Sequence, residues 1–526
     1  MKGNKLFRRP ATIWLTLGCA GFVLGVIIAA CTSTQIVCNA GLSRCGLGCA
    51  DFTSDSQNCG ACGVACQSLQ FCQNSICQCR PGSTLCGSSC VVTSSDPQNC
   101  GGCRGDGGVA CDGGVCENGQ CLAQCTPDSG LVACTGGCVD LQSDPNNCSQ
   151  CGRTCLAGQG CHHGSCASDV IAACFNNHDI IGIQAGTDAV SERHPFGTGP
   201  QALATTQGVL LQADGSDRKL RQMRLEDFTV LTNTNNLGES PNHVLVDEPY
   251  IYVVNSLGNT LEVLQGAADA GTDDAGLALT VIGQLNFGDN TSPQTMARVG
   301  TILYIPLFGG FTGMNSGIAQ VDISNRSAPA LVRTISLGSL DLRSFDGGVT
   351  YPRPEGIAYY QGSIYVGLAN LDSAYSPGGP GMLAKLDLGT LAVSPIYLPG
   401  GCLNTYWLVV SGDTLYVSCG GRFHYEGSTL VSVDSSGLLA VKPDGGMVSW
   451  NGSCTVGCIG PAVQRFAVVN DRLYLGDLLG RIFVLQNVDG GFVERRGYDF
   501  VAGGPPINGC PSDAGSSFVS DVIAIP

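Results

Sequence analysis

Cysteine is the residue type in this chain whose number and spacing could do chemistry. The 526 residues include 32 cysteines, and residues 38–166 hold 24 of them in three groups of eight. The last seven cysteines of the first group, in residues 45–77, follow the spacing C-x3-C-x9-C-x2-C-x3-C-x5-C-x4-C, which residues 134–166 repeat without change. The middle group, in residues 86–121, differs only by x7 and x4 in place of x3 and x5. One further cysteine precedes each run of seven, namely Cys38, Cys79 and Cys125.

Disulfide bonds are the chemistry that we expect of this array. Zinc or redox sites also use C-x2-C pairs, but a zinc ribbon needs two such pairs per ion, and each group has too many further thiols. Disulfides persist outside the cytosol, in modules too small to build a core. Bridges worth roughly 2–4 kcal/mol each would stabilise modules of this size. Eight cysteines allow on the order of 100 pairings, and the sequence does not choose among them.

Three small modules, at residues 38–77, 79–121 and 125–166, must position these cysteines. Each contains one turn of the form D-x2-N-C, which begins at Asp55, Asp96 or Asp144. The wider pattern C-x3-C…D-x2-N-C-G-x-C-G…C resembles the stigma-specific family of small secreted plant proteins, whose cysteine motif also occurs in bacterial lipoproteins. This resemblance covers about a quarter of the chain. It implies the fold of the module and not a function.

The N-terminus has the pattern of a secretory signal over residues 1–30. Four basic residues precede an apolar run that carries no charge between residues 11 and 30. The run ends Ile28-Ala29-Ala30-Cys31, which resembles a bacterial lipobox. The resemblance implies that Cys31 is lipidated and becomes the new N-terminus, followed by a short tether over residues 31–37. The alternative is an uncleaved transmembrane anchor, since about 20 apolar residues can span a bilayer.

The charge of the chain limits its partners. Residues 1–30 hold four bases and no acid, so the remaining chain has 22 bases against 42 acids and a net charge of −20. Such an acidic chain does not bind phosphate backbones by charge, which argues against nucleic acid as a partner. It also repels anionic membrane surfaces. We therefore expect attachment to the membrane only through the lipid anchor. The residue after this cysteine is Thr32 and not an Asp. This resembles the rule by which lipoproteins of enteric-type bacteria are sorted to the outer membrane.

Residues 167–526 lose the cysteine density and gain strand signals. One pattern recurs: an apolar strand, a tight turn, and a second strand with a central tyrosine, which is Tyr252, Tyr304, Tyr365, Tyr416 or Tyr474. Two weaker copies bring the hairpins to seven, and further strands follow most of them. We therefore predict an all-β fold class, a seven-bladed β-propeller preceded by three small disulfide-rich modules. Tyr252-Val253-Val254-Asn255 resembles the YVTN-type repeats of secreted propeller proteins. A pair of β-sandwiches is the alternative.

Six cysteines lie in this C-terminal region, and their number is even. Cys402 and Cys419 flank one hairpin, whereas Cys454 and Cys458 share a short loop. Cys174, near the first strand, and Cys510, near the end of the chain, remain. We predict that this last pair staples the propeller shut, because the first and last blades would otherwise leave bare sheet edges. The final run, residues 519–525, should add a strand to the first blade.

No catalytic set with suitable spacing occurs, and we expect no catalytic residue, metal or cofactor. His243 opens an inner strand, where it could line the central channel, but a satisfied core or rim histidine is the favoured interpretation. Lactonase-like propellers hold a metal in the channel with scattered Glu, Asn and Asp. Glu355, Asn404 and Gln464 precede inner strands and are the first residues to test for such a role.

Three functions remain open from the sequence, of which a structural surface protein with no discrete ligand is the third. The first is a lipid-anchored binding or scaffold protein of the cell envelope, which presents the propeller to an extracytoplasmic protein or glycan. The second is a metal-dependent extracytoplasmic propeller enzyme, such as a lactonase-like hydrolase. Convergent carboxylates and amides around an ion in the channel would favour the enzyme, whereas an apolar or scattered rim would favour binding.

Overall fold

The computed structural model describes residues 43–45, 48–67, 69–111, 114–122, 124–125, 130–134, 137–155, 159–162, 164–185, 187–266, 276–426, 429–442, 444–452, 459–488, 491–497, 505–510 and 518–525. Residues 1–30, Cys31, the tether at 31–37, Cys38, Cys454 and Cys458 lie outside the described residues. All regular secondary-structure elements in the described ranges are β-strands. No helix in these ranges has the length and apolarity needed to cross a membrane.

Short hairpins make up the three N-terminal modules, because few residues are available between consecutive cysteines. The strands are β1 (Ser43–Cys45), β2 (Gly48–Ala50), β3 (Gln70–Gln73), β4 (Ile76–Cys79), β5 (Thr84–Cys86), β6 (Ser89–Val91), β7 (Cys103–Arg104), β8 (Gly107–Gly108), β9 (Val115–Glu117), β10 (Gln120–Leu122), β11 (Val132–Cys134), β12 (Gly137–Val139), β13 (Gly160–His162) and β14 (Ser165–Ala167). β9 and β12 also pair with each other, so the second and third modules share one four-stranded sheet.

The disulfides of the modules follow one connectivity. The second module joins Cys79–Cys90, Cys86–Cys103, Cys100–Cys116 and Cys111–Cys121. The third repeats this order with Cys125–Cys138, Cys134–Cys151, Cys148–Cys161 and Cys155–Cys166. The described part of the first contains the matching bridges Cys45–Cys62, Cys59–Cys72 and Cys66–Cys77. The structure thus selects one pairing among the many that the sequence allows, and it does so three times.

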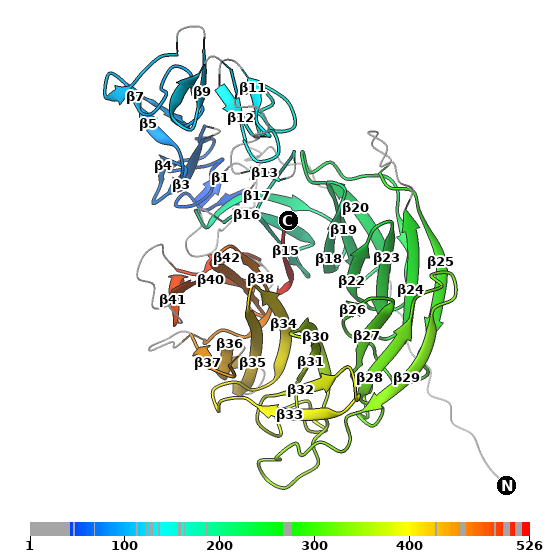
Figure 1. Ribbon diagram of the computed structural model, residues 1–526. Coiled ribbons are helices and arrows are strands. Elements are labelled where there is room, and N and C mark those ends of the chain that lie inside the picture. Colours follow the sequence, from blue (N-terminus) through cyan, green and yellow to red (C-terminus); the bar gives the residue numbers. More distant parts are fainter. Residues whose placement is uncertain are drawn as a thin grey trace, which may run out of the picture. The chain divides into compact units, whose positions relative to one another are not determined.

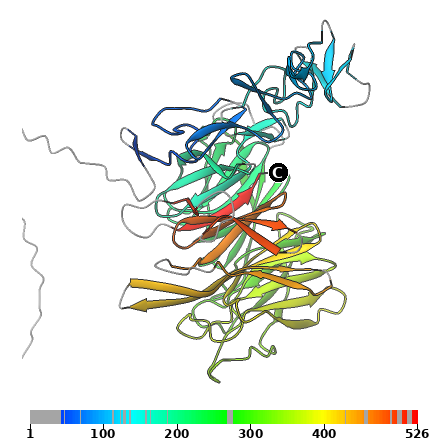
Figure 2. The same ribbon diagram turned by 90° about the vertical axis from the view of Figure 1, so that its left-hand side faces the viewer.

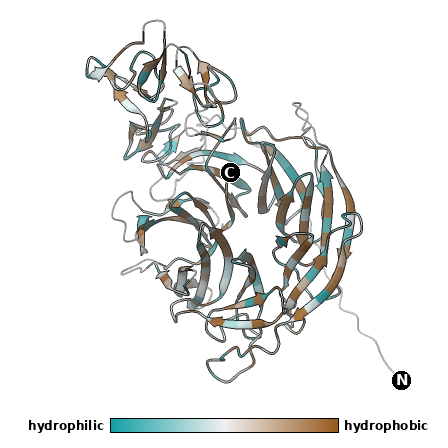
Figure 3. Cartoon of the chain, viewed as in Figure 1, coloured by the Kyte–Doolittle hydropathy of each residue, from teal (hydrophilic) through white to brown (hydrophobic). Residues whose placement is uncertain are grey.

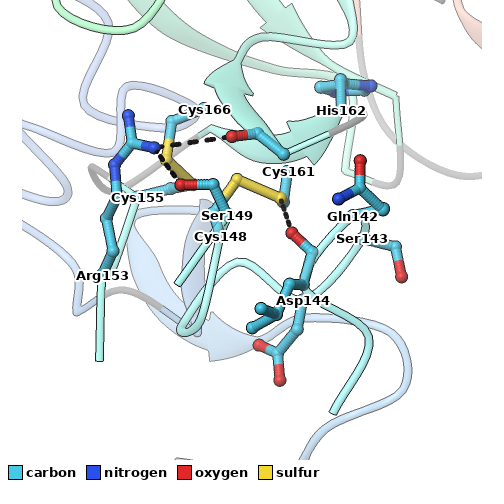
Figure 4. The surroundings of a disulfide bond; sticks show 12 residues. Gln142, Ser143, Asp144, Cys148, Ser149, Arg153, Cys155, Cys161, His162 and Cys166 are labelled. Carbon is cyan, nitrogen blue, oxygen red and sulfur yellow. Dashed lines mark hydrogen bonds between the residues drawn. A yellow bond between two sulfur atoms is a disulfide. The ribbon is translucent and has the colours of Figure 1, made fainter. Parts of the chain in front are cut away.

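The repeated Asp turn orients these bridges. Asp55, Asp96 and Asp144 each accept a hydrogen bond from the backbone N–H two residues later, at 2.8, 2.7 and 2.8 Å. This is the turn geometry that Asp at the first position favours. Figure 4 shows the third module, where Cys148–Cys161 lies beside Arg153, whose guanidinium donates to the hydroxyl of Ser149 at 2.6 Å.

Seven separate antiparallel sheets lie around a central axis in the C-terminal region (Figure 1). The sheets are here called blades 1 to 7, and the strands of each are given from the innermost to the outermost. Blade 1 has β43 (Val519–Ala524), β15 (Val170–Cys174), β16 (Asp179–Gln184) and β17 (Ala189–Pro195); blade 2 has β18 (Pro200–Thr206), β19 (Val209–Asp214), β20 (Lys219–Arg224) and β21 (Asn235–Asn236); blade 3 has β22 (Pro241–Asp247), β23 (Tyr250–Asn255), β24 (Thr260–Gly266) and β25 (Leu279–Asn286); and blade 4 has β26 (Ala297–Val299), β27 (Ile302–Leu307), β28 (Gly317–Asp322) and β29 (Ala330–Ser336). Blade 5 has β30 (Pro354–Tyr360), β31 (Ser363–Leu368), β32 (Met382–Asp387) and β33 (Val393–Tyr397); blade 6 has β34 (Thr405–Ser411), β35 (Thr414–Glu426), β36 (Thr429–Val441) and β37 (Met447–Trp450); and blade 7 has β38 (Val463–Val469), β39 (Arg472–Asp477), β40 (Arg481–Val488) and β41 (Gly491–Arg496). β42 (Ile507–Asn508) also pairs with β40 in blade 7.

Buried apolar side chains of neighbouring blades pack against one another, and Figure 3 shows hydrophobic residues along the strands of the ring. The five tyrosines predicted at the centres of second strands all lie in such strands, β23, β27, β31, β35 and β39, and all are buried. β18 contacts both β22 and β43, and β34 contacts both β30 and β38. The core is therefore a series of interfaces between neighbouring sheets.

Ring closure combines a strand, a disulfide and a buried ionic cluster. β43, from the end of the chain, pairs with β15, the first strand after the modules. Cys174 and Cys510 are joined by a disulfide of S–S length 2.10 Å. Between blades 1 and 7, Asp188 accepts hydrogen bonds from Arg472 Nη1 at 2.7 Å and from the Tyr474 hydroxyl at 2.8 Å. Each contact links segments from opposite ends of the propeller sequence.

Blade 6 has a feature that the sequence did not predict. β35 and β36 are each 13 residues long, and they remain paired beyond the part of the sheet that β34 and β37 cover. The resulting two-stranded extension projects from the ring in Figure 2. Cys402 and Cys419 form a disulfide at its base, with an S–S length of 1.94 Å.

Candidate binding site in the propeller channel

The innermost strands begin on one side of the ring, here called the mouth face. In five blades the register of the innermost strand shifts within its first residues, at Pro200/Ala202, Pro241/His243, Pro354/Ile357, Thr405/Leu408 and Val463/Phe466. A bulge adds a residue to one strand and re-aims its side chains, and bulges are common next to functional sites. In four of these five strands the second residue lines the cavity described below, namely Gln201, Asn242, Tyr406 and Gln464.

A cavity of about 360 Å³, here called the cup, opens at this end of the channel. Amides, hydroxyls and one arginine make up most of its wall. The lining residues are Phe175, Gln201, Gly215, Ser216, Arg218, Glu239, Ser240, Asn242, Leu257, Tyr406, Gln464, Arg465, Phe518 and Ser520. They come from several blades or the loops beside them, so only the closed ring assembles the cup.

Two residues of the wall, Gln201 and Asn242, belong to a chain of side-chain amides, here called the amide belt, which passes from blade 2 to blade 4. Gln201 Nε2 donates to Asn242 Oδ1 at 3.1 Å, and Asn242 Nδ2 donates to Gln294 Oε1 at 2.7 Å. Gln294 Nε2 in turn donates to the hydroxyl of Ser292 at 3.1 Å. Because each amide both donates and accepts, the belt holds these side chains in one orientation.

Arg465 forms the floor of the cup. Its side chain is 2 % exposed, and its Nη1 lies 3.3 Å from Oδ2 of Asp521 on the neighbouring blade 1. Nη2 donates to the backbone carbonyl of Asn242 in blade 3 at 2.7 Å, which means that the guanidinium reaches across the channel. The guanidinium also lies 4.3 Å from the ring of Trp407, which His243 contacts edge-on at 5.6 Å. These contacts close the channel below the cup.

Burial changes the titration of the groups around this floor. It raises the pKa of Glu355 to about 8, although the charges of Arg465 and Arg353 act in the opposite direction. Burial also raises the pKa of Tyr406 to about 12, and the nearby charge of Glu355 adds to this effect. The pKa of His243 falls to about 3, first through burial and then through the charge of Arg465. Glu355 and His243 are therefore both uncharged near neutral pH.

The rim of the cup offers an apolar surface beside a charged one. Phe175 and Phe518 stack with ring centroids 5.0 Å apart and planes inclined by 15°. Arg218 and Glu239 form an ion pair at 3.1 Å, and both of these side chains are about half exposed. An exposed ion pair of this kind contributes little to stability, so it is free to exchange partners with a ligand.

The structure brings two of the three sequence-predicted channel residues to this site. Glu355 and Gln464 are each the second residue of an innermost strand, β30 and β38 respectively. Asn404 precedes β34 by one residue, and its amide lies against Gly420, where an added Cβ would be 2.9 Å from Nδ2. The equivalent position in blade 6 belongs to Tyr406. His243 reaches the channel region, but it packs on Trp407.

Sequence reasoning missed most of the cup. Gln201, Asn242, Gln294, Arg465 and Asp521 were not predicted, although a signal for three of them is present. Four innermost segments begin with proline followed directly by a polar residue, as Pro200-Gln201, Pro241-Asn242, Pro293-Gln294 and Pro354-Glu355. Proline is tolerated at the first residue of a strand, so this dipeptide marks where each innermost strand starts.

The residues at this site do not form a recognisable metal centre. Among the described residues, each group of three His, Cys, Asp or Glu side chains close enough to share an ion consists of cysteines, and all of these are in disulfides. Asp521 pairs with Arg465, and the electrostatic partners of Glu355 are arginines.

Comparisons with known proteins give similarity of structure only. No protein-family model and no curated protein matches the chain. A candidate 6-phosphogluconolactonase from Bacteroides fragilis is similar at 12 % identity and a TM-score of 0.44, covering 68 % of this chain and 97 % of that one. AztD from Citrobacter koseri is similar at 14 % identity and a TM-score of 0.40, with coverages of 68 % and 97 %. A protein of unknown function from Desulfotomaculum acetoxidans is similar at 14 % identity and a TM-score of 0.42, covering 66 % of this chain and 100 % of that one.

These similarities say nothing about ligand or activity. The class of protein follows from the chain itself. It is an all-β protein in which disulfide-rich modules precede a propeller of antiparallel sheets.

Proposed function

We propose that this protein is a lipid-anchored binding protein of the cell envelope, and that its cup binds the end of a glycan. The amide belt carries this proposal, because amides that both donate and accept suit the hydroxyls of a sugar. The charges of the cup floor are paired within the protein, which favours a ligand without strong charge.

The remaining wall supports the same ligand class. The side-chain amide of Gln464 lines the cup, and no hydrogen bond to it is found among the described residues, which leaves this amide available to a ligand. The stacked pair Phe175 and Phe518 offers an apolar surface for the C–H face of a sugar ring. The cavity volume of about 360 Å³ lies in the range of ligand pockets, roughly 300–1,000 Å³.

The proposed cellular location of the protein is supported by other observations. Thirteen disulfides among the described residues, from Cys45–Cys62 to Cys402–Cys419, support an oxidising compartment. The lipobox-like sequence that ends at Cys31 supports anchoring to a membrane, and Thr32 after it supports the outer membrane. The modules would then separate the propeller from its anchor.

A glycan microarray tests the proposed ligand class. Purified protein should be retained by a subset of envelope polysaccharide fragments, and Gln464→Ala should weaken retention by about tenfold, the effect of losing a hydrogen bond made in a desolvated pocket. Gln284→Ala is the matched control, because Gln284 lies exposed on the outermost strand of blade 3. The proposal fails if no glycan is retained, or if the two variants bind equally.

A further inference from the structure

Beside blades 4 and 5, the mouth face carries a second surface, formed by large exposed apolar side chains. Phe311, Met314 and Val349 are 76 %, 79 % and 71 % exposed, and Phe345 and Tyr375 are exposed as well. These five residues are here called the aromatic patch. They lie in three loops, which follow β27, precede β30 and follow β31, all at the end of the blades where innermost strands start.

The three loops form one continuous surface. The hydroxyl of Tyr375 donates to the carbonyl of Phe311 at 3.4 Å, which joins the first loop to the third. The backbone N–H of Phe345 donates to the carbonyl of Gly378 at 2.9 Å, which joins the second loop to the third. The long hairpin of blade 6 completes the surface, because the guanidinium of Arg422 lies 5.4 Å from the ring of Phe345. Exposed apolar patches of this kind mark interaction sites.

A fully buried arginine holds the patch in place. Arg353 is 0 % exposed, and its guanidinium lies 4.7 and 4.5 Å from the rings of Phe308 and Tyr375. It donates to the carbonyls of Gly310 and Phe311, at 3.2 Å for the latter. A charge buried this completely must keep its acceptors, so the loop that carries Phe311 is fixed. An anchor that is ordered before binding loses little conformational entropy when a partner docks.

The charges around the patch select its partner. Asp289, Asp341 and Asp346 are exposed beside the patch. Asp341 forms an ion pair with Arg343 at 3.9 Å. Arg422 is partly covered by Phe345, and Arg353 is buried. Three exposed carboxylates therefore stand against one exposed guanidinium, that of Arg343, so the rim is net acidic, like the chain as a whole. An anionic membrane would be repelled by this rim, and a second copy would bring the same acidic rim to a twofold interface.

We propose that the aromatic patch is a docking surface for a partner protein whose contact face has an apolar centre and a basic rim. Phe311 and Met314 are its anchors, and the acidic rim provides charge complementarity and orientation. This surface is separate from the cup. A protein can therefore be bound at the patch whether or not a glycan is bound in the cup.

Two synthetic peptides with the same Leu- and Trp-rich centre test the proposal, one flanked by lysines and the other by glutamates. Full-length protein should bind the lysine-flanked peptide in a salt-dependent manner and should not bind the other. Phe311→Ser combined with Met314→Ser should weaken binding by at least about tenfold. Val332→Ser is the matched control, because Val332 is an exposed apolar residue on the outermost strand β29.

Further measurements distinguish docking at the patch from a change in folding, membrane binding or self-association. Thermal melting should be the same for all variants, since the substituted side chains are exposed, and Gln464→Ala should leave peptide binding unchanged. The proposal is overturned if the patch variant binds the peptide as tightly as Val332→Ser does. It is also overturned if the patch substitutions instead abolish binding to vesicles or dissociate a dimer while peptide binding persists.

Discussion

Arg353 and Arg465 are the most deeply buried arginines among the described residues, at 0 % and 2 % exposed, and both contact residues of the mouth face. Arg465 is held by Asp521, by the carbonyl of Asn242 and by the ring of Trp407, whereas Arg353 is held by two carbonyls and aromatic rings. A planar guanidinium suits both environments, because it forms several hydrogen bonds in fixed directions and stacks on rings. Removing one partner of a buried charge typically lowers the free energy of unfolding by about 3–5 kcal/mol. We therefore expect the contacts of these two arginines to keep the local geometry fixed.

Glu355 and His243 should give the stability of the protein opposite pH dependences. The pKa of Glu355 rises from 4.5 to about 8 on folding, so the folded state retains a proton that the unfolded chain has lost. Its contribution to stability is therefore lost as pH rises between about 4.5 and 8. The pKa of His243 falls from 6.5 to about 3, so its contribution is lost as pH falls below about 6.5.

We predict that Glu355→Gln flattens the upper part of this profile. At pH 8 the variant should gain on the order of 2 kcal/mol in free energy of unfolding relative to its gain at pH 5, because Gln has no proton to lose. His243→Gln should flatten the lower part instead. Urea unfolding measured from pH 4 to pH 8 checks both variants. Profiles parallel to that of the wild type would contradict the titrations assigned to these two groups.

At the residue scale, the sequence predicted which residues lie near the channel better than it predicted the contacts that they make there. Glu355 and Gln464 were found because a polar residue stands out before an apolar run. Arg465 was missed, because an arginine within a strand is ordinarily solvent-facing, and nothing local indicates Asp521, which lies more than 50 residues later. Asn404 directly precedes β34, as predicted, but Tyr406 and not Asn404 lines the cup at this blade.

The elements of the propeller were largely predictable, whereas their irregularities were not. Hairpins were recognisable from alternating apolar residues around short turns, with a tyrosine in five second strands. The register shifts that begin five innermost strands have no comparable signal in one sequence. The extension of β35 and β36 was also missed, because the recurring pattern ends where the regular part of the blade ends.

Ring closure by Cys174–Cys510 should matter more than the local bridge Cys402–Cys419. The first spans 336 residues of sequence and the second 17. In the chain-entropy account, a loop of about 15 residues gives about 3 kcal/mol and one of several hundred gives nearly 6 kcal/mol. We predict that replacing both cysteines of the long bridge by serine lowers the free energy of unfolding by about 5–6 kcal/mol.

The double serine variant at Cys402 and Cys419 is the matched comparison, with an expected loss of about 3 kcal/mol. Both variants also lose their buried sulfurs, so the difference between them isolates the effect of loop length. Urea unfolding under one set of conditions measures it. A greater loss for the local bridge would show that the strand pairing of β43 with β15 closes the ring without help from the disulfide.

For the whole molecule, disulfides replace a hydrophobic core in the modules and reinforce one in the propeller. The modules bury mainly half-cystines, whereas the propeller buries aliphatic and aromatic side chains between its sheets. Both parts therefore depend on oxidation during maturation, although to different degrees. In a reducing compartment the modules would have neither bridges nor a sufficient core with which to fold.

Lipid attachment at Cys31 leads to a prediction at this scale. Cells grown with an alkyne-labelled fatty acid should incorporate the label into the wild-type protein, because the proposed lipobox places the acyl chains on this cysteine. Cys31→Ser should abolish labelling, as followed by in-gel fluorescence after coupling a dye. Cys19→Ser is the matched control, since Cys19 lies within the apolar run that the proposed cleavage would remove. Equal labelling of the two variants would rule out Cys31 as the anchor.

The position of a bound oligosaccharide tests the central claim, that the closed ring assembles a glycan-binding cup. A crystal structure of the protein with an array-selected oligosaccharide measures this position directly. We predict a sugar ring in the cup, with a hydroxyl at hydrogen-bond distance from the amide of Gln464 and an apolar face toward Phe175 and Phe518. An oligosaccharide bound elsewhere on the molecule, with the cup unoccupied, would contradict the claim.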